Sequence, residues 1–100
     1  MNFEEPKISG FTIYSKSGCP NCNKVKTLLN EKNIIFFLVD CDEYIFDHKE
    51  KFLLFIKEIA NKECKTFPMV FYDNTFVGGY NETQEYVDKL FLSFDENINF

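Results

Sequence analysis

The chain has 100 residues, 45% hydrophobic content, thirteen phenylalanines and a net charge of −5. This is enough apolar material for a single domain over residues 1–100. The acidic residues are spread along the chain and no basic patch is present, so nucleic acid is not an expected partner. No apolar stretch is long enough to span a bilayer, and residues 1–6 do not read as a signal peptide. We therefore expect a cytoplasmic protein without a membrane partner. Its four cysteines fit reduced thiols that cycle through a reaction better than the disulfide framework of a secreted protein.

The first informative stretch is Cys-Pro-Asn-Cys at residues 19–22. A β-branched and aromatic run at residues 11–14 predicts a strand before it, and apolar residues at helical spacing predict a helix over about residues 20–32. The two thiols then lie at the start of a helix, on the same side, where they can close a small disulfide. Helix N–H groups and a cation at Lys16 both stabilise a thiolate there. Cys19 is therefore the predicted nucleophile, and the better shielded Cys22 the predicted resolving thiol.

A zinc site is the competing interpretation of this motif, since two cysteines separated by two residues also have metal-ligand spacing. A structural zinc normally needs a second pair of ligands. The remaining candidates are Cys41, Cys64 and His48, which show no recognisable spacing. We expect no metal, regard Cys41 and Cys64 as bystander thiols, and place His48 at an exposed helix start.

The middle of the chain predicts a second strand and a second helix. The apolar run at residues 34–39 is typical of a strand buried on both faces in a parallel pair. Residues 40–47 form a polar connection, and Asp47 with Glu50 could cap the helix that follows. The apolar stripe of that helix consists of Phe52, Phe55, Ile56 and Ile59.

The last third predicts a hairpin and a final helix. Residues 69–72 and 75–77 flank Asp73-Asn74, a residue pair that tolerates positive φ in a tight turn. Asn81 and Gln84 suggest a capping box for a helix whose stripe is Val87, Leu90, Phe91 and Phe94, followed by a tail at residues 95–100. The element order β-α-β-α-β-β-α predicts a four-stranded mixed sheet with helices on both faces.

Three segments together resemble the signature of the dithiol glutaredoxins, which have a thioredoxin-like fold. They are residues 14–22, ending in the two cysteines, Thr66-Phe67-Pro68 before a strand, and residues 78–82 at the start of the last helix. The resemblance covers about residues 11–94. Asn21 is a departure, since family members mostly carry Tyr or Phe there, and the redox potential cannot be transferred from them.

The resemblance implies that glutathione binds as a co-substrate. Pro68 matches the family's cis-proline, which places the backbone of Phe67 beside the active-site sulfur, where it would pair with glutathione as an added strand. Lys16 resembles the residue that meets a glutathione carboxylate. The other matching positions are Thr66, Gly79, Tyr80 and Asn81, the last three at a helix N-terminus that suits the γ-glutamyl carboxylate. Glu82 stands where the family more often has Asp and receives no assigned role.

The activity implied is that of a monomeric, glutathione-dependent thiol–disulfide oxidoreductase using Cys19 and Cys22. Its implied partners are glutathione and proteins that are glutathionylated or contain disulfides, with ribonucleotide reductase as a candidate. Two alternatives remain open. A thioredoxin-type reductase could supply the electrons, or the chain could be a binding module holding a [2Fe–2S] cluster through Cys19 and glutathione. Pro20 argues against the cluster, because cluster-binding members usually have a small residue there.

Overall fold

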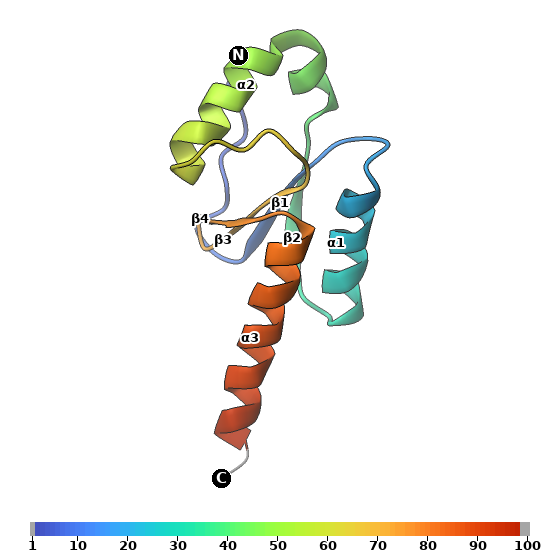
Figure 1. Ribbon diagram of the computed structural model, residues 1–100, viewed down its shortest axis with the longest axis vertical. Coiled ribbons are helices and arrows are strands. Elements are labelled where there is room, and N and C mark those ends of the chain that lie inside the picture. The colour runs from blue at the N-terminus through green and yellow to red at the C-terminus, as the bar shows by residue number, and fades with distance from the viewer. Residues whose placement is uncertain (1, 99–100) are drawn as a thin grey trace.

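A computed structural model describes the backbone of residues 2–98 and the side chains of residues 2–90. The elements in chain order are β1 (Phe11–Ser15), α1 (Pro20–Glu31), β2 (Phe36–Asp40), α2 (Asp42–Ala60), β3 (Met69–Tyr72), β4 (Thr75–Gly78) and α3 (Tyr80–Ile98). This is the predicted order. Figure 1 shows the sheet between α2 on one side and α1 with α3 on the other, with α3 extending well beyond the sheet.

The four strands form a mixed sheet in the order β2-β1-β3-β4. Strand β1 pairs in parallel with β2 and antiparallel with β3, and β3 pairs antiparallel with β4. All five residues of β1 are buried. The central strand therefore delivers its last residue, Ser15, to the edge of the sheet at which the cysteine motif begins.

Alternate strand residues build two hydrophobic clusters, one on each face of the sheet, as the two-residue period of a strand requires. The α2 face buries Tyr14, Val39, Cys41, Phe52, Ile56, Ala60, Met69 and Phe71. The face under α1 and α3 buries Phe11, Ile13, Val25, Leu29, Val70 and Val87. The predicted stripe on α2 is confirmed. On α3, Val87 is buried as predicted, but Leu90 is 37% exposed. Phe91 and Phe94 have side chains outside the described residues.

Strand β2 corrects one prediction. The strand is parallel to β1, as expected, but it lies at the edge of the sheet and is not buried on both faces. Ile35 is 90% exposed before the strand begins, and Leu38 is 42% exposed within it. The Lys7 ammonium lies 4.2 Å from the centre of the Phe37 ring and covers part of this edge. An apolar run alone does not distinguish an edge strand from a central one.

Helix α2 begins at Asp42, so the expected polar connection at residues 40–47 is wrong. A kink at His48, with φ −143° and ψ 42°, divides the helix. The sequence did not predict the part of the helix before the kink, because charged residues and the exposed Phe46 lie there and no apolar stripe results. His48 is half-buried at the kink instead of exposed at a helix start.

The hairpin prediction is confirmed, with φ of 49° at Asp73 and 65° at Asn74. Helix α3 differs from expectation at both ends. It begins at Tyr80 and it runs to Ile98, through much of the expected tail. The Glu82 carboxylate accepts the Gly79 N–H at 2.8 Å, so the capping contact falls two residues earlier than the predicted Asn81 and Gln84 pair.

Residues before β1 are tied to the α2 face by aromatic contacts. The Phe3 ring lies 4.9 Å from the Tyr44 ring and 5.4 Å from the Phe52 ring, measured between centres. The buried Tyr14 hydroxyl donates to the Glu4 carbonyl oxygen at 2.6 Å. This segment therefore extends the core of the α2 face.

Phe52 lies at the centre of the α2-face cluster and also stacks on Phe67, with ring centres 6.2 Å apart. Phe52→Ala should lower the free energy of unfolding by about 3–5 kcal/mol, through lost apolar burial and the cavity left behind. Phe46→Ala is the matched control, because Phe46 belongs to the same helix and is 89% exposed. It should change stability by less than about 0.5 kcal/mol. Urea unfolding followed by circular dichroism measures both, and equal losses would contradict the packing described.

Candidate active site

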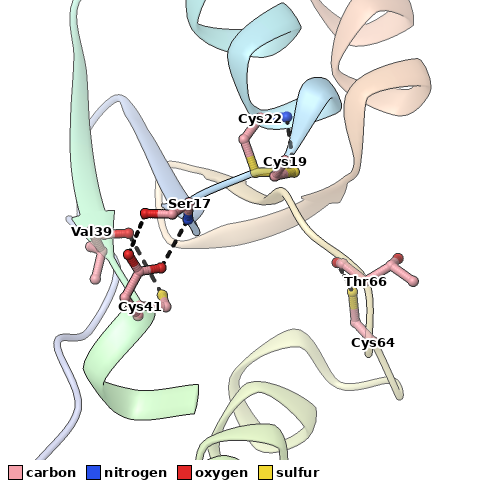
Figure 2. The surroundings of a disulfide bond; sticks show 8 residues. Ser17, Cys19, Cys22, Val39, Cys41, Cys64 and Thr66 are labelled. Atoms are coloured by element: carbon pink, nitrogen blue, oxygen red, sulfur yellow. Dashed lines mark hydrogen bonds between the residues drawn. A yellow bond between two sulfur atoms is a disulfide. The ribbon is translucent and has the colours of Figure 1, made fainter. Parts of the chain in front are cut away.

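Cys19 and Cys22 lie where β1 leads into α1, and their sulfurs are joined in a disulfide with the Cα atoms 5.2 Å apart (Figure 2). Cys19 is the N-cap residue of α1, and its sulfur accepts the backbone N–H of Cys22 at 3.2 Å. Cys19 keeps 8% of its surface exposed, whereas Cys22 is fully buried. Cys19 is thus the more accessible of the two residues, which agrees with the prediction that it is the nucleophile and that the better shielded Cys22 is the resolving thiol.

The sequence around the pair explains this geometry. Pro20 occupies the first turn of α1, where its missing N–H costs no hydrogen bond. Gly18 has φ +66°, a left-handed conformation that a residue without a Cβ adopts at little cost. The chain can thus turn sharply from the strand and place the Cys19 sulfur over the N–H groups that begin α1. A thiolate formed there gains a hydrogen bond and the favourable end of the helix dipole.

A groove of about 380 Å³ opens beside Cys19. It brings together residues of two predicted segments that are more than 40 positions apart in the sequence. Its lining consists of Lys16, Gly18, Cys19, Pro20, Asn21, Lys65, Thr66 and Phe67. Lys16, Thr66 and Phe67 thus lie beside the active-site sulfur, as the resemblance implied.

The groove carries positive charge in a protein whose net charge is −5. The Lys16 ammonium lies 5.9 Å from the centre of the Phe67 ring. Lys65 contributes a second ammonium, which pairs with Glu63 at 2.9 Å in an exposed ion pair. The sequence prediction missed Lys65, although its place directly before Thr66-Phe67-Pro68 was the available signal. Because exposed ion pairs are weak, the Lys65 ammonium can still bind a ligand carboxylate in place of Glu63.

The second signature segment has the expected backbone, since the Phe67–Pro68 peptide bond is cis. The third segment lies close by, because a Cβ placed on Gly79 would be 3.7 Å from the Pro68 carbonyl oxygen. Gly79, Tyr80 and Asn81 do not line the groove itself. Gly78 has φ +135° and no room for a side chain, since a Cβ there would lie 2.7 Å from the Glu82 Cβ. Glu82 therefore packs over the start of α3, where its carboxylate accepts the Gly79 N–H.

One contact at the site was not predicted at all. The Asp42 carboxylate accepts the backbone N–H of Ser17 at 2.8 Å and also accepts the Ser17 hydroxyl. Figure 2 draws both hydrogen bonds from Ser17. They hold the pKa of Asp42 below its ordinary value, and the charge of Lys16 adds to this effect. Asp42 is thus ionised at neutral pH and ties the start of α2 to the loop before Cys19.

The other two cysteines are placed as bystanders. Cys41 is fully buried, and its thiol donates to the Val39 carbonyl oxygen at 3.6 Å. Burial raises the pKa of Cys41 to about 12. Cys64 is half-buried, donates to the Thr66 carbonyl oxygen at 3.6 Å, and also has a pKa raised by burial. Neither is a ready thiolate at neutral pH.

Two kinds of feature are absent from the described part of the chain. No cluster of three or more His, Cys, Asp or Glu side chains suited to a metal ion occurs among those residues. In the same part of the chain, no helix is both long enough and apolar enough to cross a membrane.

These environments predict an order of alkylation in the reduced protein. With iodoacetamide at pH 7, Cys19 should react first, Cys64 more slowly, and Cys41 should stay unmodified until the protein is unfolded in urea. The raised pKa of Cys41 keeps it protonated well above neutral pH, since ionisation follows only as the pH approaches about 12. Peptide mass mapping at timed intervals identifies the modified residues. Early labelling of Cys41 in the folded protein would contradict its burial.

Comparison with known proteins agrees with this site. A family model described as Glutaredoxin matches residues 11–77, which include both cysteines and Pro68. Glutaredoxin 1 of Rickettsia felis is 42% identical over 67 residues, which cover 67% of this chain and 61% of that protein. The match thus spans less than two thirds of that relative.

Solved structures support the predicted fold. The crystal structure of glutaredoxin 1 from Francisella tularensis complexed with cacodylate has a TM-score of 0.71 and 29% identity, and the match covers 81% of this chain and 94% of that one. The buckwheat glutaredoxin–glutathione complex, at 19% identity, has a TM-score of 0.66 with 80% and 69% covered, a similarity that concerns the fold alone. The fold is the thioredoxin-like one, and the chain belongs to the glutaredoxin family.

Proposed function

We propose that this protein is a glutathione-dependent thiol–disulfide oxidoreductase that reduces glutathione mixed disulfides and protein disulfides. The observation that carries the proposal is the Cys19 sulfur, which caps α1 at the surface and borders a groove with two lysines. Proposed partners are glutathione and disulfide-containing or glutathionylated proteins, with ribonucleotide reductase as one candidate. The proposed state is a monomer in the cytoplasm, where glutathione keeps thiols reduced.

The proposed reaction begins with the reduced Cys19 thiolate. It attacks the glutathione sulfur of a mixed disulfide, the substrate sulfur leaves as a thiolate that takes a proton from water, and a Cys19–glutathione disulfide forms. The thiolate of a second glutathione then attacks the glutathione sulfur of that disulfide. This step releases oxidised glutathione and regenerates the Cys19 thiolate.

A protein disulfide follows a different second step. Cys19 forms a mixed disulfide with the substrate, and Cys22 then attacks the Cys19 sulfur and releases the substrate as a dithiol. The product is the Cys19–Cys22 disulfide, which is the state of this structure. Two glutathione molecules reduce it again, so electrons and sulfur–sulfur bonds balance over the cycle.

The groove offers complementary charge for glutathione, which carries two carboxylates. Lys16 and Lys65 provide cations beside Cys19, and the backbone at Phe67, which also lines the groove, pairs with the cysteinyl part. The buckwheat relative is a complex with glutathione, which supports this choice of ligand. At the start of α3 the Glu82 carboxylate holds the Gly79 N–H. A ligand carboxylate would therefore use the N–H groups of Tyr80 and Asn81, or displace Glu82.

Two cysteine substitutions test the assigned roles. Cys19→Ser should abolish turnover, because no other described thiol lies at the surface end of a helix in the groove. Cys22→Ser should keep activity with a glutathionylated peptide, since glutathione can resolve the intermediate, and should lose reduction of protein disulfides. The assay couples oxidised glutathione to glutathione reductase and NADPH. An active Cys19→Ser protein would reverse the assignment.

A charge reversal at Lys16 tests glutathione recognition. Charge-assisted contacts are worth about 1.5–3 kcal/mol, less when exposed, so Lys16→Glu should raise KM for a glutathionylated peptide about tenfold. Lys16→Gln should raise KM less. Lys51→Glu makes the same change in charge on α2 outside the groove and is the control. If Lys16→Glu and the control have equal KM values, Lys16 does not contact the ligand and a reductant served by a thioredoxin-type reductase becomes the better proposal.

A further inference from the structure

We propose that Asp42 is a positioning residue for Cys19, acting through its two hydrogen bonds to Ser17. The inference rests on one step of the proposed function, the attack by the Cys19 thiolate, and does not depend on which reductant or substrate the protein uses. Asp42 does not touch the reacting sulfur. It holds the chain segment that leads into it.

The topology brings the two residues together. Strands β1 and β2 are parallel, so their carboxyl ends leave the same edge of the sheet, with Ser15 opposite Asp40. The Cys41 N–H donates to the Ser15 carbonyl oxygen at 2.8 Å and continues the ladder by one more hydrogen bond. Asp42 directly follows Cys41, and Ser17 lies two residues beyond Ser15, so both residues leave the sheet next to this last contact.

The local hydrogen bonds leave the Asp42 side chain available for Ser17. The backbone N–H of Asp42 at the start of α2 is accepted by the Asp40 carboxylate at 3.0 Å. The carboxylate of Asp42 reaches across to the loop after β1, where it accepts both the N–H and the hydroxyl of Ser17. A carboxylate that accepts two hydrogen bonds from one residue fixes both the position and the orientation of that residue.

The loop needs such a restraint. Lys16, Ser17 and Gly18 are all exposed, and Gly18 is free to change conformation. Cys19 must nevertheless keep φ −115° and ψ 102° for its sulfur to accept the Cys22 N–H. With Ser17 fixed to α2 and Pro20 fixed in α1, only Gly18 and Cys19 remain between two anchored residues. Without Asp42, the Cys19 sulfur can move off the helix terminus and lose the N–H that stabilises its thiolate.

A purely electrostatic role for Asp42 makes the opposite prediction. A negative charge near a thiol disfavours the thiolate, so its removal alone would make Cys19 ionise at lower pH. Lys16 acts on the Asp42 carboxylate through its charge. Asp40, which accepts the Asp42 N–H, and the adjacent Glu43 are the neighbouring acidic residues. Releasing Lys16 from Asp42 would act in the same direction as removing the negative charge. Loss of positioning instead makes Cys19 ionise at higher pH. The sign of the change therefore separates the two roles.

The experiment uses the full chain with Cys22→Ser, so that Cys19 is the one active-site thiol. Its first readout is the rate of Cys19 modification by iodoacetamide against pH, with peptide mapping to assign the label. Its second is the single-turnover reaction with 4,4′-dithiodipyridine, in which the Cys19 thiolate forms a mixed disulfide and one pyridinethione is released. Asp42→Ala should move the alkylation midpoint to higher pH and slow the second reaction at pH 7 about tenfold, the order of loss expected from a misplaced reacting group.

Asp42→Asn is the conservative variant. Its amide oxygen can accept the Ser17 N–H and its amide nitrogen can donate to the hydroxyl, so it should keep at least half of the wild-type rate although the charge is gone. Glu43→Ala is the matched control, because it removes the same charge from the same turn of α2. Neither variant should shift the midpoint upward. Circular dichroism and urea unfolding verify that each variant is folded.

Ser17→Ala tests the same contact from the other side and protects the test if Asp42→Ala fails to fold. It removes the hydroxyl bond and keeps the backbone one, so it should shift the midpoint in the same direction by a smaller amount. Asp42→Ala should then slow the dithiodipyridine reaction less in a protein that already carries Ser17→Ala than in the parent protein. The proposal is overturned if Asp42→Ala leaves the midpoint unchanged or lowers it, or if Ser17→Ala does so when Asp42→Ala is unfolded. Failure of the proposed function would look different, with no preferential modification of Cys19 in the Cys22→Ser parent itself.

Discussion

The central strand β1 is the constraint on which the active site depends. It is buried along its whole length and hydrogen-bonded on both sides, so the position of Ser15 at its end is fixed by the sheet. The four residues after it must cross to the start of α1, which is itself held by the packing of Val25 and Leu29 on the sheet. Cys19 thus lies in a short segment whose two ends, β1 and α1, are both packed against the core. A side chain in such a place keeps its geometry at little further entropic cost, because the core has already ordered both ends of the segment.

Much of the site could be predicted from the sequence because its signals are local. A helix start directly after Cys19 follows from Pro20 and from the apolar spacing of α1, and the Asp73-Asn74 turn follows from the backbone preferences of those two residues. The side-by-side placement of the cysteines and Phe67 is different, since it joins distant segments and came from a resemblance to a family. Periodicity or spacing alone would not have brought them together.

The features that were missed depend on long-range contacts or on competition between local ones. Whether the apolar run at β2 is central or at the edge is decided by the strand order, which residues 34–39 do not encode. Two residue pairs were candidates for capping α3, Gly79 with Glu82 and Asn81 with Gln84. Glu82 makes the contact because Gly78 and Gly79, which lack a Cβ, leave room for its side chain to fold back over the backbone. Asp42 could not be paired with Ser17 before the register of β1 and β2 was known. In each case the missing information is the position of a neighbouring element.

Cys19 and Cys41 show that a position at a helix start does not by itself make a cysteine reactive. Both are N-cap residues that follow a strand, one before α1 and the other before α2. Cys19 has the extended backbone of a capping residue and turns its sulfur toward a helix N–H, while ψ at Cys41 is 8° and its side chain makes no capping hydrogen bond. The Cys41 thiol instead enters the core and donates to Val39, where burial favours the neutral form. Both residues are cysteines at a helix N-cap, so the difference between their environments arises from the backbone angle ψ and from the side on which each sulfur lies.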